Sequence, residues 1–161
     1  MTEFNNRDVV RAISKGNVLL LESYFLNGLS SRNVTENEQW NLLHQATLLI
    51  GKMANEKSVK LLLSKGINVN AIDAYGNAPI HYAIRNNDVA TVKLFVRERA
   101  NLDISNNEGI TPLHQSLLAN PVSVELVSYL VESGACINDS VLALSNALGN
   151  ETVIEILERE A

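Results

Sequence analysis

The chain has 161 residues, 46% of them hydrophobic and only 5% aromatic, and its formal net charge is −5. That length suits one compact domain or a short array of repeats with an aliphatic core. No run of about 18 apolar residues occurs, so we expect no membrane-spanning helix. The start, MTEFNNRDVV, lacks a basic stretch followed by an apolar one, so we expect no secretory signal. The single cysteine, Cys136, excludes an internal disulfide and favours a reducing compartment, so we expect a cytoplasmic protein.

The acidic charge is concentrated in the last third of the chain. Residues 106–161 carry one basic and eight acidic side chains, a net charge of −7, whereas residues 1–35, 36–72 and 73–105 carry +1, +1 and 0. A negative field of this kind disfavours nucleic acid and anionic membranes and favours a partner with a basic surface. The alternative is an acidic surface that only keeps the protein soluble.

The first segment predicts a pair of helices. Asn5 and Asn6 can cap a helix over residues 7–15, and Gly16 with Asn17 ends it. A second helix is expected over residues 18–26. Gly28 follows in the left-handed conformation that suits the end of a helix.

From residue 36 onward the chain repeats itself. Gly76 to Gly109, Pro79 to Pro112 and His81 to His114 are each 33 residues apart, which is the signature of a repeat architecture. His44 precedes His81 by 37 residues, so the earlier copy contains four extra residues. We place this insertion around residues 51–56, in the turn between two helices.

Each copy predicts a turn followed by two helices. In the second copy Asn41 caps a helix that begins at Leu42, Gln39 takes the place of Gly76, and the second helix is expected over residues 57–64. The third copy opens with the turn at residues 73–76 and has its second helix over residues 89–98. Ala78 there lacks a capping hydroxyl, and Arg99 occupies a helix-end position that favours glycine.

The fourth and fifth copies differ in how they begin. Thr111 is the cap and Pro112 the first helical residue of the fourth copy, a favourable pair. We expect Asn120 to cap its second helix, Pro121 to open it, and the helix to end near Ser133. The fifth copy has no turn motif; it predicts helices over residues 138–148 and 152–158.

The Gly-x-Thr-Pro-Leu-His pattern around Gly109 and its copies resembles the ankyrin repeat. The resemblance implies an all-α solenoid of helix-turn-helix units joined by β-hairpin loops, in one domain. Its units would be residues 1–35, 36–72, 73–105, 106–138 and 139–161, the first and last acting as caps. It also implies a protein that binds other proteins rather than an enzyme.

The three histidines suggest a metal site, but their spacing argues against it. Each occupies the same place in successive copies, and stacked helices lie about 8–10 Å apart, whereas zinc needs ligand nitrogens about 2 Å from the metal. The resemblance implies instead that this histidine bonds loop backbone and ties neighbouring units together.

Cys136 lies in a loop with no histidine expected beside it, and Glu36 and Glu38 lie on a loop without a predicted cleft. We therefore expect no catalytic residue, metal or cofactor.

In the ankyrin fold the loop tips and the exposed side of the first helix of each unit line a concave face. Carried over by position, this implies a partner-binding surface with an apolar patch rimmed by charge. The expected binding residues are Glu38, Trp40, Tyr75, Asn77, Arg85, Asn86, Glu108 and Ile110. Trp40 has an alternative role, as structural cover packed over the neighbouring loop.

The expected function is non-enzymatic binding of another protein by a monomer. Stand-alone chains of this size and acidity resemble some bacterial ankyrin immunity proteins, so one expectation is an inhibitor that neutralises a basic partner. The alternative is a scaffold, adaptor or host-directed effector that localises a partner without inhibiting it. An enzyme with an unrecognised site is the third possibility.

Overall fold

The computed structural model describes residues 5–48 and 51–161. These residues form ten α-helices and no strand, which confirms the all-α solenoid expected from the sequence. The helices are α1 (Asn6–Lys15), α2 (Val18–Leu26), α3 (Leu42–Thr47), α4 (Glu56–Ser64), α5 (Pro79–Arg85), α6 (Val89–Arg97), α7 (Pro112–Leu117), α8 (Val124–Glu132), α9 (Asp139–Leu148) and α10 (Glu151–Glu160).

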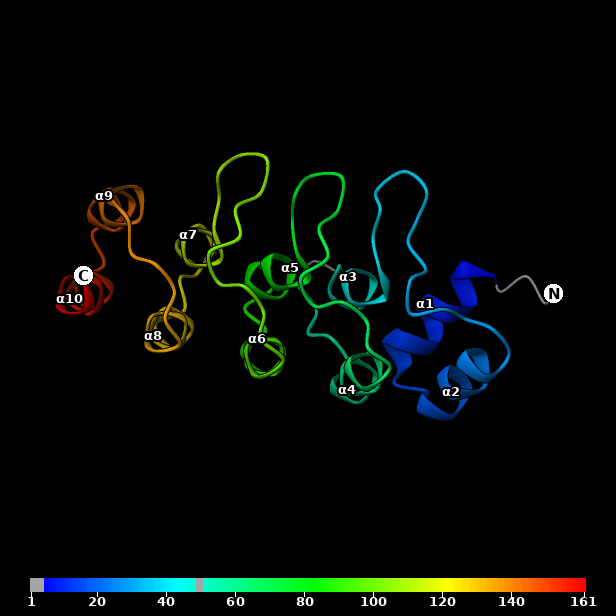
Figure 1. Cartoon of the computed structure of the whole chain (residues 1–161). Helices are drawn as coiled ribbons and strands as arrows, with labels where there is room; N and C mark the ends of the chain where they lie inside the picture. The colour runs from blue at the N-terminus through cyan, green and yellow to red at the C-terminus, as the bar shows by residue number, and fades with distance from the viewer. Residues whose placement is uncertain (1–4, 49–50) are drawn as a thin grey trace.

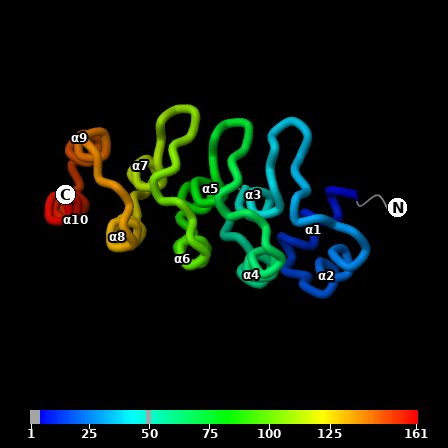
Figure 2. The backbone as a smooth tube through the Cα atoms, viewed as in Figure 1, coloured from blue at the N-terminus to red at the C-terminus, as the bar shows by residue number. Residues whose placement is uncertain are grey.

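The helices stack in two rows to form an elongated solenoid (Figure 1). The helices α1, α3, α5, α7 and α9 each pack against the next along one row, and α2, α4, α6, α8 and α10 form the second row. Three long loops leave the first row on the same side, as the tube through the backbone also shows (Figure 2). The two ends of the chain lie at opposite ends of the stack. A continuous face of loops and first-row helices is therefore available to a partner.

An aliphatic core runs through the stack because equivalent positions in successive copies are all apolar. Leu43, Ile80 and Leu113 occupy one such position and are each fully buried. Leu62 and Phe95 do the same in the second row. Since every layer buries its apolar residues against the next, the loops are held in a regular array.

Most of the predicted caps are confirmed, because capping is a local interaction. The side chain of Asn41 accepts from the backbone N–H of Leu43 and His44, and Thr111 accepts from that of His114. Asn138 caps α9 in the same way. As expected, Ala78 makes no side-chain cap; instead its backbone N–H donates to Nδ1 of His81 at 3.1 Å.

The predicted start of α8 is wrong. The helix begins at Val124, not at Pro121, and its cap is Ser123, whose hydroxyl accepts from the backbone N–H of Leu126 at 3.2 Å. Residues 120–122 instead form an ordered loop, in which the carbonyl of Pro121 accepts from the side chain of Asn87 at 3.0 Å. This contact with the preceding unit explains why the chain delays the helix.

The four-residue insertion is partly outside the described residues, since residues 49 and 50 are not described. The remainder confirms a turn, because residues 51–55 precede α4 and carry no helix. Gly51 donates its backbone N–H to the side chain of Asn86, and Ala54 donates to the carboxylate of Asp88. The inserted loop is thus tied to the third copy.

Three residues other than glycine, Gln39, Asn87 and Arg99, have the positive φ that favours glycine. Arg99 has φ 61° and Gln39 has φ 58°, whereas Gly76 and Gly109 at the position of Gln39 have φ 77° and 76°. Such a conformation costs a residue with a side chain about 1 kcal/mol relative to glycine.

Replacing Arg99 with glycine is therefore expected to raise the free energy of unfolding by up to about 1 kcal/mol. The Asn70 side chain donates a hydrogen bond to the backbone carbonyl of Arg99 at 3.0 Å. Because the acceptor is a backbone atom, this bond remains when glycine replaces Arg99. Urea denaturation followed by circular dichroism measures the change. The matched control is Arg97→Gly at the last residue of α6, where φ is helical and glycine should lower stability rather than raise it. A clear loss for Arg99→Gly would show that the guanidinium makes a compensating contact.

No helix in residues 5–48 and 51–161 has the length and apolar character needed to cross a lipid bilayer.

Candidate protein-binding surface

The three loops on one side of the solenoid are linked to one another by backbone hydrogen bonds. Ala74 donates its N–H to the carbonyl of Glu38 at 2.9 Å, and Asn107 donates to the carbonyl of Tyr75 at 3.0 Å. The second link requires glycine at position 76, because a Cβ there would lie 2.8 Å from the backbone nitrogen of Asn107. The loop tips therefore form one connected surface.

Asp73 organises the central loop. It is only 4% exposed, and its Oδ1 accepts from the backbone N–H groups of Tyr75 and Asn77 at 2.8 and 2.9 Å. Its Oδ2 accepts from the Trp40 indole at 3.2 Å and from the hydroxyl of Tyr82. Burial, followed by the hydrogen bond to Asp73, raises the pKa of Tyr82 to about 12. The tyrosine is therefore a neutral donor at physiological pH.

Trp40 forms a hydrogen bond within the protein, and its side chain is also partly exposed. Its side chain is half-buried, and its N–H reaches Asp73 in the next unit. Asn77 stands at the equivalent position one unit later, and its Oδ1 accepts from the side chain of Asn106 at 3.0 Å. In both units the side chain at this position forms a hydrogen bond with the next loop. Trp40, being only half-buried, is also partly exposed on the surface.

Two histidines tie first-row helices to the following loop, as the repeat predicts. Nε2 of His44 bonds the carbonyl of Asn77 at 3.0 Å, and Nε2 of His81 bonds the carbonyl of Ile110 at 3.1 Å. Their Nδ1 atoms accept from the backbone N–H of the helix cap. His114 has no following loop of this kind, and within the described residues it makes no such bond. The expectation therefore holds for two of the three histidines.

Burial lowers the pKa of both His44 and His81 below the ordinary imidazole value, even though backbone carbonyls and the carboxylate of Asp73 act in the opposite direction. The unfolded chain binds these protons near pH 6.5, whereas the folded chain binds them only at a lower pH. Their contribution to stability is therefore complete above about pH 6.5 and is lost as the pH falls below it.

We expect His81→Ala to lower the free energy of unfolding by about 1–3 kcal/mol at pH 8, through the lost hydrogen bonds. The variant should also lose less stability than the parent between about pH 7 and pH 5. Urea denaturation at several pH values measures both effects, with His114→Ala as the matched control. A parent protein whose stability is flat over that range would contradict the assignment.

A groove lies between the three loops, which belong to the second, third and fourth units, and is bordered by α5 and α7. It has a volume of about 430 Å³, and it brings together six of the eight predicted binding residues. These six are Trp40, Tyr75, Asn77, Arg85, Glu108 and Ile110. The groove also has amide walls, contributed by Asn106, Asn107 and Gln115.

The groove combines an aromatic wall with both signs of charge. Tyr75, which lines the groove, is 57% exposed. The exposed guanidinium of Arg85 lies 4.6 Å from the centre of the buried Tyr82 ring, a cation–π contact that holds the arginine in place. Glu108 is exposed on the opposite loop. Aromatic residues and arginine in such a setting are the typical anchors of protein interfaces.

The other two predicted binding residues lie outside the groove. Asn86 is half-buried; it donates to the carbonyl of Thr47 at 2.8 Å and accepts from Gly51, so its side chain fastens the inserted loop. Glu38 lies on the rim of a separate concavity toward the N-terminal end. The eight predicted residues do not include Leu48, Tyr82, Asn106, Asn107 and Gln115, which also line the groove. Tyr82 and Gln115 occupy the same position in successive repeats. That shared position is the feature of the sequence from which both could have been predicted to line the groove.

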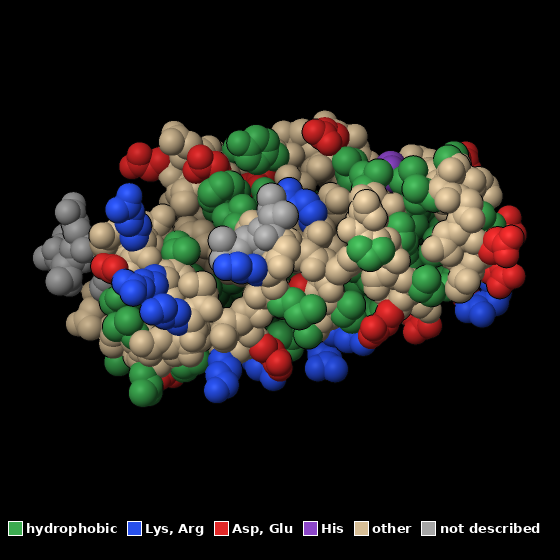
Figure 3. Space-filling view, turned by 180° about the vertical axis from the view of Figure 1, so that it is seen from behind, with side chains coloured by type: hydrophobic (Ala, Val, Ile, Leu, Met, Phe, Trp, Pro, Cys, Tyr) green, Lys and Arg blue, Asp and Glu red, His purple; other side chains and the backbone are tan. Residues whose placement is uncertain are grey.

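The charge asymmetry is visible on the surface of the folded chain. In the view from behind, acidic side chains gather at the end occupied by α9 and α10, and hydrophobic side chains gather across the middle (Figure 3). The exposed acidic residues of α10 include Glu151, Glu155 and Glu158, which share one side of the helix by spacing.

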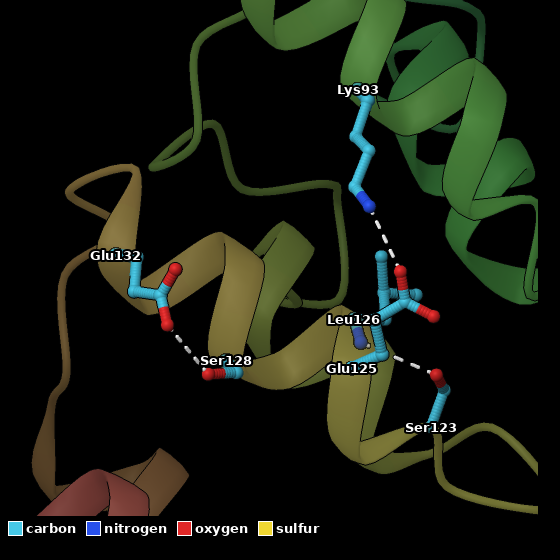
Figure 4. A network of polar contacts seen from close by, with 6 residues as sticks. All are labelled: Lys93, Ser123, Glu125, Leu126, Ser128 and Glu132. Atoms are coloured by element: carbon cyan, nitrogen blue, oxygen red, sulfur yellow. Dashed lines mark hydrogen bonds and ion pairs between the residues drawn. The ribbon is translucent and has the colours of Figure 1, made fainter.

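Two acidic residues of α8 are already engaged within the protein (Figure 4). Glu125 forms an ion pair with Lys93 of α6 at 2.8 Å, and Glu132 accepts from the hydroxyl of Ser128 at 2.9 Å. The carboxylates of α10 are therefore better candidates than these two for attracting a partner.

The described residues contain no cluster of three or more histidine, cysteine or acidic side chains arranged to hold a metal ion. Cys136 is exposed in the loop before α9, and its backbone N–H donates to the carboxylate of Asp103 at 2.8 Å. Its surroundings are those of an ordinary loop residue.

Comparison with known proteins gives a consistent result. A family model described as ankyrin repeats (3 copies) matches residues 52–141 and 80–160. The chain is 33% identical over 135 residues to interferon antagonist OPG040 of vaccinia virus (strain Western Reserve), covering 83% of this chain and 44% of that protein. It is 38% identical over 92 residues to the fowlpox virus ankyrin repeat protein FPV219, covering 56% of this chain and 20% of that one.

A cellular protein is also similar. The nuclear factor NF-kappa-B p105 subunit of Gallus gallus is 29% identical over 102 residues, which cover 61% of this chain and 10% of that protein. The chain thus spans less than half the length of each of these relatives. Solenoids of this kind bind other proteins through extended concave surfaces. The matched repeats and the two-row stack of helices show that the chain belongs to the ankyrin repeat family.

Proposed function

We propose that this chain binds a partner protein in the groove between its three loops and thereby neutralises that partner. The groove carries the proposal, since it gathers Trp40, Tyr75 and Ile110 beside a fixed arginine in one connected surface. A hot spot of this type requires rigid anchors, and the hydrogen bonds among the loops supply the rigidity. The vaccinia virus relative is named an interferon antagonist, which is consistent with a neutralising role.

The partner presents a basic surface in this proposal. The acidic α10 would increase the rate at which such a partner arrives, and the groove would hold it once bound. The two roles are separable because long-range attraction acts on association, whereas buried anchors act on dissociation.

The triple variant Glu151→Gln, Glu155→Gln, Glu158→Gln is expected to slow association and to flatten its dependence on salt, with little change in dissociation. Surface plasmon resonance at two salt concentrations measures both rates. The matched control is Glu56→Gln on α4, whose carboxylate lies in an exposed pair with Lys60 far from α10. An unchanged association rate in the triple variant would reject the basic partner.

Neutralisation itself is tested on the partner's own activity. The immobilised chain captures the partner, which is identified by mass spectrometry, produced separately and assayed with increasing amounts of the chain. We expect activity to be lost in proportion to the complex formed, and to be retained with Tyr75→Ala. Tight binding that leaves the activity intact would instead identify an adaptor, the alternative function for the same surface.

A further inference from the structure

Arg85 is the one basic residue among the described residues that line the groove. Its side chain is exposed, and the cation–π contact with the ring of Tyr82, at 4.6 Å, fixes where its guanidinium lies. The ion pairs of the described chain do not include Arg85, and its guanidinium donates no hydrogen bond there. Five N–H donors in a fixed position are therefore without a protein acceptor in the free chain.

Leucines hold the place of Arg85 in the neighbouring copies. Leu48, Arg85 and Leu118 each follow the repeated histidine of their own copy by four residues. Because α5 packs against both α3 and α7, and packed helices lie about 8–10 Å apart, the two leucines lie about one helix spacing to either side of the arginine. Leu48 also lines the groove, and Leu118 is exposed. The guanidinium thus lies between two apolar side chains along the first row of helices.

A partner that fills the groove covers this guanidinium. Taking a charged group out of water is costly unless the group is paired and hydrogen-bonded, so the partner has to supply an acceptor to Arg85. The carboxylate of an aspartate or glutamate fits best, because it accepts two parallel N–H bonds from a guanidinium and also cancels its charge. A neutral carbonyl accepts a bond but leaves the charge uncompensated.

Gln115 of α7 offers a second donor in the same groove. It is half-buried among the lining residues, and its side-chain amide makes no hydrogen bond within the described chain. Gln115 holds the place in the fourth copy that Tyr82, the residue in contact with the guanidinium, holds in the third. A carboxylate has two oxygens that each accept hydrogen bonds, so it can bond the guanidinium and this amide together.

Acidic residues around the groove favour a carboxylate over a phosphate group. Glu108 is exposed on the groove lining, and Asp73 accepts from the hydroxyl of the same Tyr82 that contacts the guanidinium. A phosphorylated side chain carries a charge of about −1.5 to −2 at pH 7, so these two residues repel it more strongly than they repel a single carboxylate.

We propose that the groove binds an acidic side chain of the partner, whose carboxylate pairs with the guanidinium of Arg85 and accepts from the amide of Gln115. Apolar side chains of the partner beside that acid cover Leu48 and Leu118. The inference rests on the proposed function, because it takes the groove as the interface. It adds one feature to the partner: within a basic surface, an aspartate or glutamate bordered by apolar residues meets the groove.

The test titrates the whole chain with a short probe, acetyl-Leu-Glu-Leu-amide, and with two further peptides in which glutamine or phosphoserine replaces the glutamate. ¹H–¹⁵N correlation spectra report the Nε–H of Arg85 and the side-chain amide of Gln115 directly. We expect both signals to shift saturably with the glutamate peptide, and the dissociation constant to rise about fivefold or more with the glutamine peptide. Equal binding of the glutamine peptide, tighter binding of the phosphoserine peptide, or no saturable shift with the glutamate peptide would overturn the proposal.

Arg85→Gln is the decisive variant because it removes the charge and keeps a polar side chain at an exposed position, so folding should be intact. We expect it to bind the glutamate and glutamine peptides equally weakly. Arg85→Lys keeps the charge but loses the flat pair of donors, so it should recover only part of the preference for glutamate. The matched control is Arg97→Gln, exposed on α6 and outside the groove lining, which should bind like the parent. A preference for glutamate that persists undiminished in Arg85→Gln would reject the assignment.

The acidic contact and the proposed function can fail separately. If the captured partner loses affinity for Tyr75→Ala but binds Arg85→Gln as tightly as the parent, the groove is the interface and the acidic contact is wrong. If the glutamate peptide binds as expected but Tyr75→Ala leaves partner binding unchanged, the groove recognises a carboxylate and the proposed function is wrong.

Discussion

Replacing Asp73 with alanine is expected to lower the free energy of unfolding by about 3 kcal/mol. The carboxylate is almost fully buried and receives four donors, from the backbones of Tyr75 and Asn77 and from the side chains of Trp40 and Tyr82. Alanine leaves these donors without an acceptor in a place that water reaches poorly. The loss should appear in the midpoint of urea denaturation at neutral pH, with an unchanged slope.

The chain provides a matched control at Asn106, which holds the same place in the fourth copy. Its Oδ1 accepts from the backbone N–H groups of Glu108 and Ile110 and its Nδ2 donates to Asn77, but among the described residues it has no hydrogen bond to a tryptophan or tyrosine. Asn106→Ala should therefore lose less stability, about 1–2 kcal/mol. Equal losses at the two positions would show that the contacts of Asp73 with Trp40 and Tyr82 contribute nothing.

Replacing Tyr75 with alanine is expected to weaken partner binding by about 30-fold or more, equivalent to about 2 kcal/mol. Tyr75 is 57% exposed in the free chain, so its ring is available to be buried by the partner. The change should act mainly on the dissociation rate, since anchors hold a complex after it has formed. Surface plasmon resonance with the purified partner measures it.

Tyr75 is a cleaner probe of the groove than Trp40. A change at Trp40 also removes the hydrogen bond to Asp73, so it alters stability and binding together. The stability of Tyr75→Ala should stay within about 0.5 kcal/mol of the parent because the side chain is exposed. Leu26→Ala, 87% exposed on α2, is the matched surface control and should bind like the parent. Tyr75→Ala that also binds like the parent would remove the groove from the interface.

Features that depend on neighbouring residues could be predicted from the sequence. The caps Asn41 and Thr111 and the positive φ of Arg99 follow from short-range chemistry that the repeat places in register. The start of α8 could not be predicted in this way. Asn120 and Ser123 are both good caps, and the contact between Pro121 and Asn87 of another unit favours the later one.

The groove was largely predictable because its residues follow the repeat, whereas its exceptions follow the irregular parts of the chain. Asn86 is bound by the inserted loop, which has no counterpart in the other units. Glu38 borders a different concavity, between its own loop and α1.

The central claim, that the groove is the partner interface, is tested most directly by photo-crosslinking in the native cell. A benzoylphenylalanine is introduced at position 75 in one variant and at position 26 in another, and both are irradiated and compared. The groove model predicts one strong adduct of defined mass from position 75 and none of that mass from position 26. An adduct of the same partner from position 26, with none from position 75, would contradict it and place the interface on the outer helices.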